Sequence, residues 1–253
     1  MKFWSGIAIA AAATLLSACG DINISSSSSG VPLAELEYEG ARPTGITLAG
    51  PDRMIVTSGD RLMIDVEGDP DVVEKLRFDL EDDTLSVGRE GDWRQRGIAT
   101  IRITMPTPSD LTLAGSGEIQ LDRLGTGGNA DVSIAGSGKS TVARIDADTL
   151  EVNVAGSGSL KAAGSAKKLD LSIAGSGDLN LRDLEVGDAD VAIAGSGDAV
   201  FASNGSVDAS IMGSGDVEVI GNAKCSVSSM GSGDVKCRTR TSGGGQAAAQ
   251  EAE

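Results

Sequence analysis

The stretch DLSIAGSGDLNL, from Asp170 to Leu181, carries the motif GSG in the middle of an alternating apolar and polar pattern. The motif occurs seven times in the chain, at intervals of 21, 20, 19, 20, 18 and 18 residues. Its first glycines are Gly115, Gly136, Gly156, Gly175, Gly195, Gly213 and Gly231. A period near 20 residues is typical of stacked architectures, in which each unit buries its apolar side against its neighbours.

The residues around each motif alternate with a period of two, as strands with one buried face require. Around Gly175, for example, Leu171 and Ile173 precede the motif, and Leu179 and Leu181 follow it at the same parity. Both glycines share that inward parity, so each GSG is expected to form a corner where a Cβ would collide with a neighbouring coil. The pattern predicts an all-β fold, a right-handed parallel β-helix (β-solenoid) with about 18–21 residues per coil and inward-facing GSG corners.

The two ends of the chain differ in composition from this repeat. Residues 1–18 have the pattern of a lipoprotein signal peptide, with Lys2 before a short apolar run and the sequence LSAC ending at Cys19. We expect Cys19 to be lipidated and the Ser-rich residues 19–30 to form a tether. Residues 239–253 lack an apolar period and predict a disordered tail. A single solenoid domain is therefore predicted over residues 31–238.

Within that domain, residues 109–238 hold the seven GSG repeats, and residues 31–108 lack the motif. The earlier part still contains strand-like runs such as GITLAG, RMIVTSG and IATIRITMP. Its segment DPDVVEKLRFDLEDD fits either a short helix or a strand pair. We expect irregular starting coils that cap the stack, because an open β edge promotes aggregation.

These motifs together resemble the head GIN domain family of bacterial envelope proteins, which are described as adhesins. The resemblance rests on the LSAC sequence, on GDRLMIDVEGD and DTLSVG in the first part, and on LTLAGSGEIQL followed by the IAGSGD units. It covers roughly residues 31–238. It implies a right-handed β-helix and an envelope location, and Gly20 after the lipobox cysteine favours the outer membrane. The family brings no catalytic residues that could be assigned here.

Two rows of acidic residues accompany the repeat. One precedes each GSG by five residues, and the other follows the first glycine by three. The acidic members are Asp110, Asp131, Glu151, Asp170, Asp190 and Asp208 in the first row, and Glu118, Asp178, Asp198, Asp216 and Asp234 in the second. Stacking them about 4.8 Å apart costs on the order of 1 kcal/mol per pair in water. Divalent cations or a basic partner would offset that repulsion, but we favour a structural role in which each Asp bonds its own turn amides.

Two cysteines remain besides Cys19. Cys225 and Cys237 lie six residues before and after the first glycine of the last GSG, both at inward parity. Positions related in this way face each other across a thin core. We therefore predict a disulfide bond that closes the last coil, with two unpaired core thiols as the alternative.

Composition limits the possible functions. The net charge of −16 argues against a nucleic-acid partner, and the absence of histidine excludes a Ser-His-Asp triad. Sugar-binding platforms need aromatic residues, of which the chain has few. Trp93, in EGDWRQRG, is expected to cover the first coil, with a ligand-contacting loop as the alternative.

We therefore expect a non-enzymatic envelope lipoprotein without cofactor or metal. It would be held to the membrane by its lipid and would present a rigid acidic surface to a protein or glycan ligand. Oligomerisation stays open. A polysaccharide-active β-helix enzyme and a cation-stabilised spacer are the alternatives.

Overall fold

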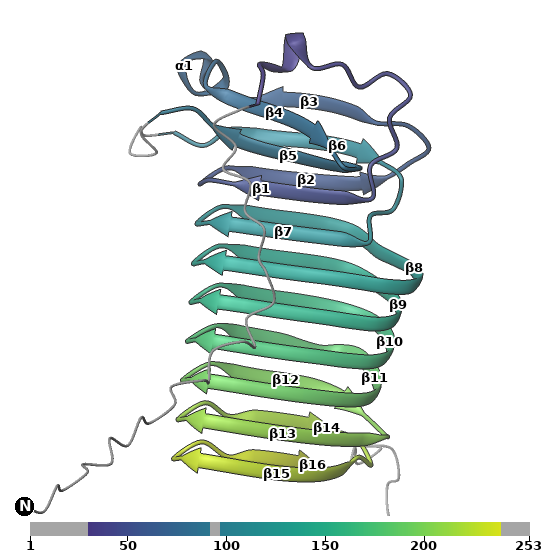
Figure 1. The fold of residues 1–253 in the computed structure, drawn as a ribbon, viewed down its shortest axis with the longest axis vertical. Coiled ribbons are helices and arrows are strands. Elements are labelled where there is room, and N and C mark those ends of the chain that lie inside the picture. The colour runs from purple at the N-terminus through teal and green to yellow at the C-terminus, as the bar shows by residue number, and fades with distance from the viewer. Residues whose placement is uncertain (1–29, 92–96, 239–253) are drawn as a thin grey trace, which may run out of the picture.

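The computed structural model describes residues 30–91 and 97–238, which form a stack of flat coils (Figure 1). The elements in chain order are η2 (Leu33–Glu35), β1 (Gly45–Ala49), β2 (Arg53–Ser58), β3 (Met63–Glu67), α1 (Pro70–Val73), β4 (Leu76–Glu81), β5 (Thr84–Arg89), β6 (Thr100–Met105), β7 (Asp110–Gly115), β8 (Glu118–Gly136), β9 (Lys139–Gly156), β10 (Ser159–Gly175), β11 (Asp178–Gly195), β12 (Asp198–Ser203), β13 (Ser206–Gly213), β14 (Val217–Ile220), β15 (Lys224–Gly231) and β16 (Val235–Arg238). The prediction of an all-β parallel solenoid is confirmed.

The regular part of the stack keeps the register that the motif spacing predicts. β7 to β11 pair in parallel one after another, and then β13 and β15 continue one face while β12, β14 and β16 continue the other. First glycines of successive motifs are direct partners, as in Gly175 opposite Gly195. Inward-facing side chains such as Ile173 and Leu181 are buried, and one continuous apolar cluster runs along the stack.

Each GSG corner is a site where the backbones of two coils approach closely. The amide of Ser176 donates to the carbonyl oxygen of Gly156 in the previous coil, at 2.8 Å. A Cβ added to Gly195, whose φ is +134°, would lie 2.1 Å from the carbonyl oxygen of Gly175. Glycine is therefore required by the neighbouring coil as well as by the backbone conformation.

The N-terminal part does not stack in chain order. β1 and β2 lie directly on β7 and β8, while β5 and β6 lie on the other side of β1 and β2. β4 and β3 then pair antiparallel with β5 and β6 and end the stack. The first coil of the chain is thus third from that end in space (Figure 1).

The segment that fitted either a helix or strands contains both. Asp69 caps the single turn of α1 by accepting a hydrogen bond from the amide of Asp71, at 2.9 Å. The chain then enters β4, where Phe78 is buried and exchanges two backbone hydrogen bonds with Val31, both of 2.8 Å. A parallel stack thus ends in two antiparallel strands and a covering segment, which together cap it.

Candidate functional site

The first predicted acidic row exists as a column in register on one face. Its members are direct neighbours from coil to coil, in the order Asp110, Asp131, Glu151, Asp170, Asp190, Asp208 and then Ser226. Small side chains such as Ser172, Ala192 and Ser210 lie beside the column. Together they line a shallow groove of about 450 Å³ between Asp170 and Ser228.

Part of the repulsion along this column is offset locally. The ammonium group of Lys168 lies 2.9 Å from a carboxylate oxygen of Asp170 and 3.1 Å from one of Asp190. Hydrogen bonds to these two carboxylates raise the pKa of Lys168. Nearer the N-terminal end of the column, the side-chain amide of Asn153 donates to Glu151 at 2.9 Å. The remaining carboxylate of the groove, Asp208, is exposed.

Burial acts on one member of the column. Asp131 is half-buried, and desolvation raises the pKa of its carboxyl group above the ordinary value of 3.8. Its neighbours Glu151 and Asp110 add to that rise, while the hydroxyl of Ser133, donating at 2.9 Å, opposes it. The cost at Asp131 thus comes mainly from burial of its charge, and the neighbouring carboxylates add to it.

The second acidic row has a different role. Asp198 accepts a hydrogen bond from the amide of Asp216, at 2.8 Å, and Asp216 accepts one from the amide of Asp234, at 3.0 Å. These carboxylates therefore join each coil to the next. The sequence interpretation had each Asp bonding amides of its own turn. For Asp198 and Asp216 it is wrong, because these carboxylates accept from a backbone N–H of the next coil.

The start of this row carries an ion pair. Glu118 accepts from the guanidinium group of Arg53 at 2.7 Å and from the side-chain amide Nε2 of Gln120 at 2.8 Å. These hydrogen bonds, with that of Gln120 the stronger influence, lower the pKa of Glu118. Among residues 30–91 and 97–238, no group of three acidic or cysteine side chains is arranged to hold a metal ion.

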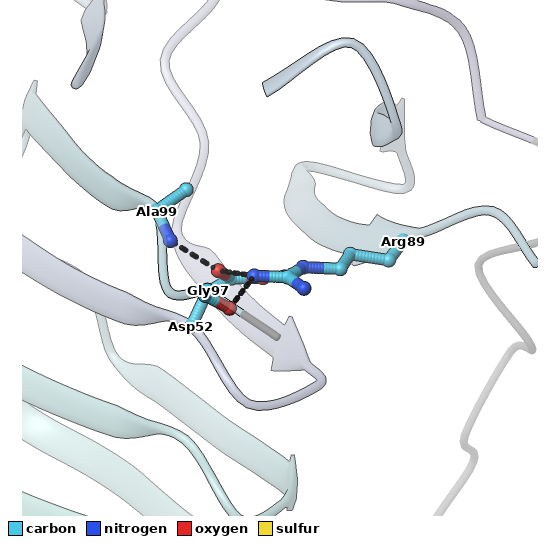
Figure 2. Close-up of polar contacts among 4 residues, drawn as sticks. All are labelled: Asp52, Arg89, Gly97 and Ala99. Atoms are coloured by element: carbon cyan, nitrogen blue, oxygen red, sulfur yellow. Dashed lines mark hydrogen bonds and ion pairs between the residues drawn. The ribbon is translucent and has the colours of Figure 1, made fainter. Parts of the chain in front are cut away.

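A buried ion pair lies at the N-terminal end of the corner column (Figure 2). The carboxylate of Asp52 accepts from the guanidinium group of Arg89, with one of the contacts at 2.6 Å, and from the amide of Ala99 at 2.7 Å. Arg89 also donates to the carbonyl oxygen of Gly97 at 3.0 Å. Both charged side chains are almost completely buried.

The strand register explains why this pair occurs here. Ala49 is opposite Ala114 and Arg53 opposite Glu118, so the sequence GPD at residues 50–52 occupies the place of a GSG corner. Asp52 carries a side chain at this place, and its carboxylate lies between Arg89 at the end of β5 and Ala99 just before β6. Residues 46–50 read ITLAG, and residues 111–115, which lead into the first GSG, read LTLAG. This similarity is the sequence signal that would have identified the eighth corner.

Cys225 and Cys237 are joined by a disulfide bond across the last coil, with their Cα atoms 6.7 Å apart. Several other predicted features lie outside the described residues. These are the signal peptide, Cys19 and the tether up to residue 29, Trp93, and the tail at residues 239–253. No helix in the described part of the chain is long and apolar enough to cross a membrane.

These observations define a repetitive parallel β-solenoid whose polar groups lie in columns on open faces. The family described as "Putative auto-transporter adhesin, head GIN domain" matches residues 42–223, and the chain belongs to this family. The expected family membership is thus confirmed.

Solved structures share the fold. A structure described as a putative adhesin from Bacteroides fragilis has a TM-score of 0.70 and 21% identity, over 77% of this chain and 92% of that one. One described as a putative lipid binding protein from Parabacteroides distasonis has a TM-score of 0.61 and 22% identity, over 81% and 95%. None of the curated proteins matches the chain.

Proposed function

We propose that the protein is a non-enzymatic lipoprotein of the bacterial envelope that uses one face of its solenoid for adhesion. The binding face would be the groove beside Asp170, Asp190 and Asp208. The observation that carries this proposal is the in-register carboxylate column next to small side chains. Such a face is flat, rigid and open, and it suits an extended ligand with regularly spaced cationic or hydroxyl groups.

The family and the Bacteroides structure, both described as adhesins, support a surface role. The lipid anchor at Cys19 is proposed from the LSAC sequence alone. It would place the solenoid at the outer membrane, with a protein or glycan as ligand.

The adhesion role is tested by binding of the lipidated protein to bacterial and host surface glycans and proteins. The test variant carries Asp170→Asn, Asp190→Asn and Asp208→Asn. A matched control removes three exposed acids elsewhere, with Asp60→Asn, Asp146→Asn and Asp183→Asn. We expect binding to weaken at least about tenfold in the first variant only. Equal binding by both variants would contradict the assignment of this face.

The anchor is tested separately by mass spectrometry of the mature N-terminal peptide. Diacylglyceryl-modified Cys19 is expected, and Cys19→Ala should leave the protein unprocessed. Reducing-sugar release from bacterial polysaccharides would instead establish the enzymatic alternative. A rise in melting temperature with Ca²⁺, reversed by chelator, would establish the cation-stabilised spacer.

A further inference from the structure

The last coil of the solenoid carries an uncovered strand edge. β15 and β16 pair with β13 and β14 on one side, and within residues 30–91 and 97–238 no strand pairs with their other side. The apolar side chain of Val227 is 49% accessible there, whereas that of Ala209, its partner in the preceding coil, is buried. An edge of this kind accepts another strand unless it is protected.

The backbone hydrogen bonds show which residues face that edge. On β15, the amide of Lys224 donates to the carbonyl oxygen of Gly205, at 2.8 Å. On β16, the carbonyl oxygen of Asp234 accepts from Val217 at 2.9 Å, and that of Arg238 accepts from Gly221 at 2.8 Å. These residues therefore point back into the stack.

Successive residues of a strand direct their backbone groups to alternate sides. The residues between those just named thus present their N–H and C=O groups at the open edge. They are Cys225, Val227 and Ser229 on β15, and Val235 and Cys237 on β16.

We propose that two copies of the chain pair end to end through this edge, around a two-fold axis that passes through Val227 and Val235. These residues lie four positions before and after Gly231, so they face each other across the coil, next to the disulfide. Because the axis is perpendicular to both strands, β15 runs antiparallel to β15 of the second copy, and β16 runs antiparallel to β16 of the second copy. Val227 then pairs with Val227 of the second copy, and Val235 with Val235, both through groups already at the edge.

The same axis brings complementary side chains together. Lys236 lies 3.5 Å from Asp234 of its own chain, and the axis places it beside Asp234 of the second copy as well, so that the two lysines and two aspartates alternate. On the other face the axis places Ser226 beside Ser228. Lys224 comes to lie beside Met230 of the second copy. In this register Asp234, just before β16, faces a lysine and not another carboxylate.

The preceding coil shows that this pattern is particular to the end. Lys236 stands opposite Glu218 of β14, and Ser226 stands opposite Asp208 of β13. If β13 and β14 formed the edge, the equivalent axis would place Glu218 beside Asp216 of the second copy. The last coil thus has Lys236 in the place of Glu218, which would repel Asp216 of a second copy.

The test is native mass spectrometry of the full-length protein released from detergent micelles, together with sedimentation velocity. A dimer is expected for the wild type. Lys236→Glu should raise the dissociation constant at least about tenfold, because it places a second carboxylate beside Asp234 of the other copy. The double variant Asp234→Lys, Lys236→Glu exchanges the two charges and should restore dimerisation.

A second pair of variants tests the apolar contact between the two copies at Val227. Val227→Lys adds a charge at the edge and should give monomers, whereas Ser210→Lys adds the same charge one coil earlier and should leave the dimer intact. A monomeric wild type, or a double charge exchange that fails to restore the dimer, would overturn the proposal. Dimerisation only after deletion of residues 239–253 would also overturn it, because the chain's own tail would then occupy the edge.

Discussion

The N-terminal and C-terminal ends of the solenoid meet the same physical requirement in different ways. A stack of parallel coils leaves unpaired backbone groups and apolar core at each end. At the N-terminal end, β3 and β4 turn antiparallel, and the segment around Val31 covers β4. At the C-terminal end, the last coil repeats the regular geometry and is cross-linked across its width by the disulfide.

Apolar side chains are more deeply buried at the N-terminal end of the stack than at the C-terminal end. In the N-terminal part, Leu85, Ile101 and Phe78 are fully buried close to the end of the stack. In the last coil, Cys225 and Val235 are only partly buried. A stack of repeats is stabilised mainly by nearest neighbours, so the two ends should unfold independently of each other. The predictions below use that expectation, from the largest effect to the smallest.

The first prediction concerns the buried pair of the N-terminal end. Asp52→Ala leaves the guanidinium group of Arg89 buried without its carboxylate and removes the acceptor for the amide of Ala99. We expect a loss of about 3–5 kcal/mol in the free energy of unfolding, measured with urea. Arg53→Ala, which removes only an exposed ion pair with Glu118, should cost less than about 1 kcal/mol.

A double variant separates charge from packing at this site. Asp52→Leu with Arg89→Met removes both charges, and it should recover much of the stability that Asp52→Ala loses. If the double variant were as unstable as Asp52→Ala, packing or the unbonded amide of Ala99, and not the unpaired charge, would explain the loss.

The second prediction concerns the C-terminal end. Replacing both Cys225 and Cys237 with serine should lower the stability of the last coil by about 2–3 kcal/mol, because the unfolded segment regains its freedom. Hydrogen exchange should accelerate in β15 and β16 and stay unchanged around Asp52. Faster exchange throughout the stack would show that the ends are coupled, contrary to the nearest-neighbour view.

The regular coils were predictable from sequence because their signal is local and repeated. The position of each GSG and the alternation around Gly175 fix both the register and the buried face. The N-terminal end was less predictable, since its order in space depends on contacts between distant segments. Arg89 and Asp52 are 37 residues apart, and no periodicity connects them.

The acidic rows show the same limit within the candidate site. Their columns followed from spacing, but the partners of each carboxylate did not. Lys168 bridges Asp170 and Asp190, but most coils have no lysine at this position of the repeat, so the periodic pattern gave no sign of it. The bond from the amide of Asp216 to Asp198 depends on how the carboxylate is oriented toward the next coil, which the motif spacing does not specify.

The third prediction concerns a buried polar side chain, Ser140, which lies between the two ends of the stack. Ser140 is buried between Ile119 and Leu160, and its hydroxyl has no hydrogen-bond partner within the part of the chain that the structure describes. Ser140→Val should raise the free energy of unfolding by about 1–2 kcal/mol, since it removes an unsatisfied group and adds apolar contact. Ser140→Ala, which removes only the hydroxyl, should give part of that gain. A loss of stability in both variants would indicate that the hydroxyl is satisfied by a buried water.

The last prediction concerns pH and the carboxylate column, and its effect is the smallest. Desolvation raises the pKa of Asp131 in the folded protein, so the folded state binds this proton more tightly than the unfolded chain does. The charged carboxylate therefore destabilises the fold above the folded-state pKa. This cost declines as the pH falls through that value, and it disappears below the ordinary pKa of 3.8.

Asp131→Asn should accordingly stabilise the protein at pH 7 and lose its advantage near the acidic limit, as urea unfolding at several pH values would show. Asp208→Asn is the matched control, because Asp208 is an exposed member of the same column. Its substitution should have little effect on stability at any pH. An advantage of Asp131→Asn that grew toward acid would mean that the fold favours the charged form of Asp131, contrary to the desolvation argument.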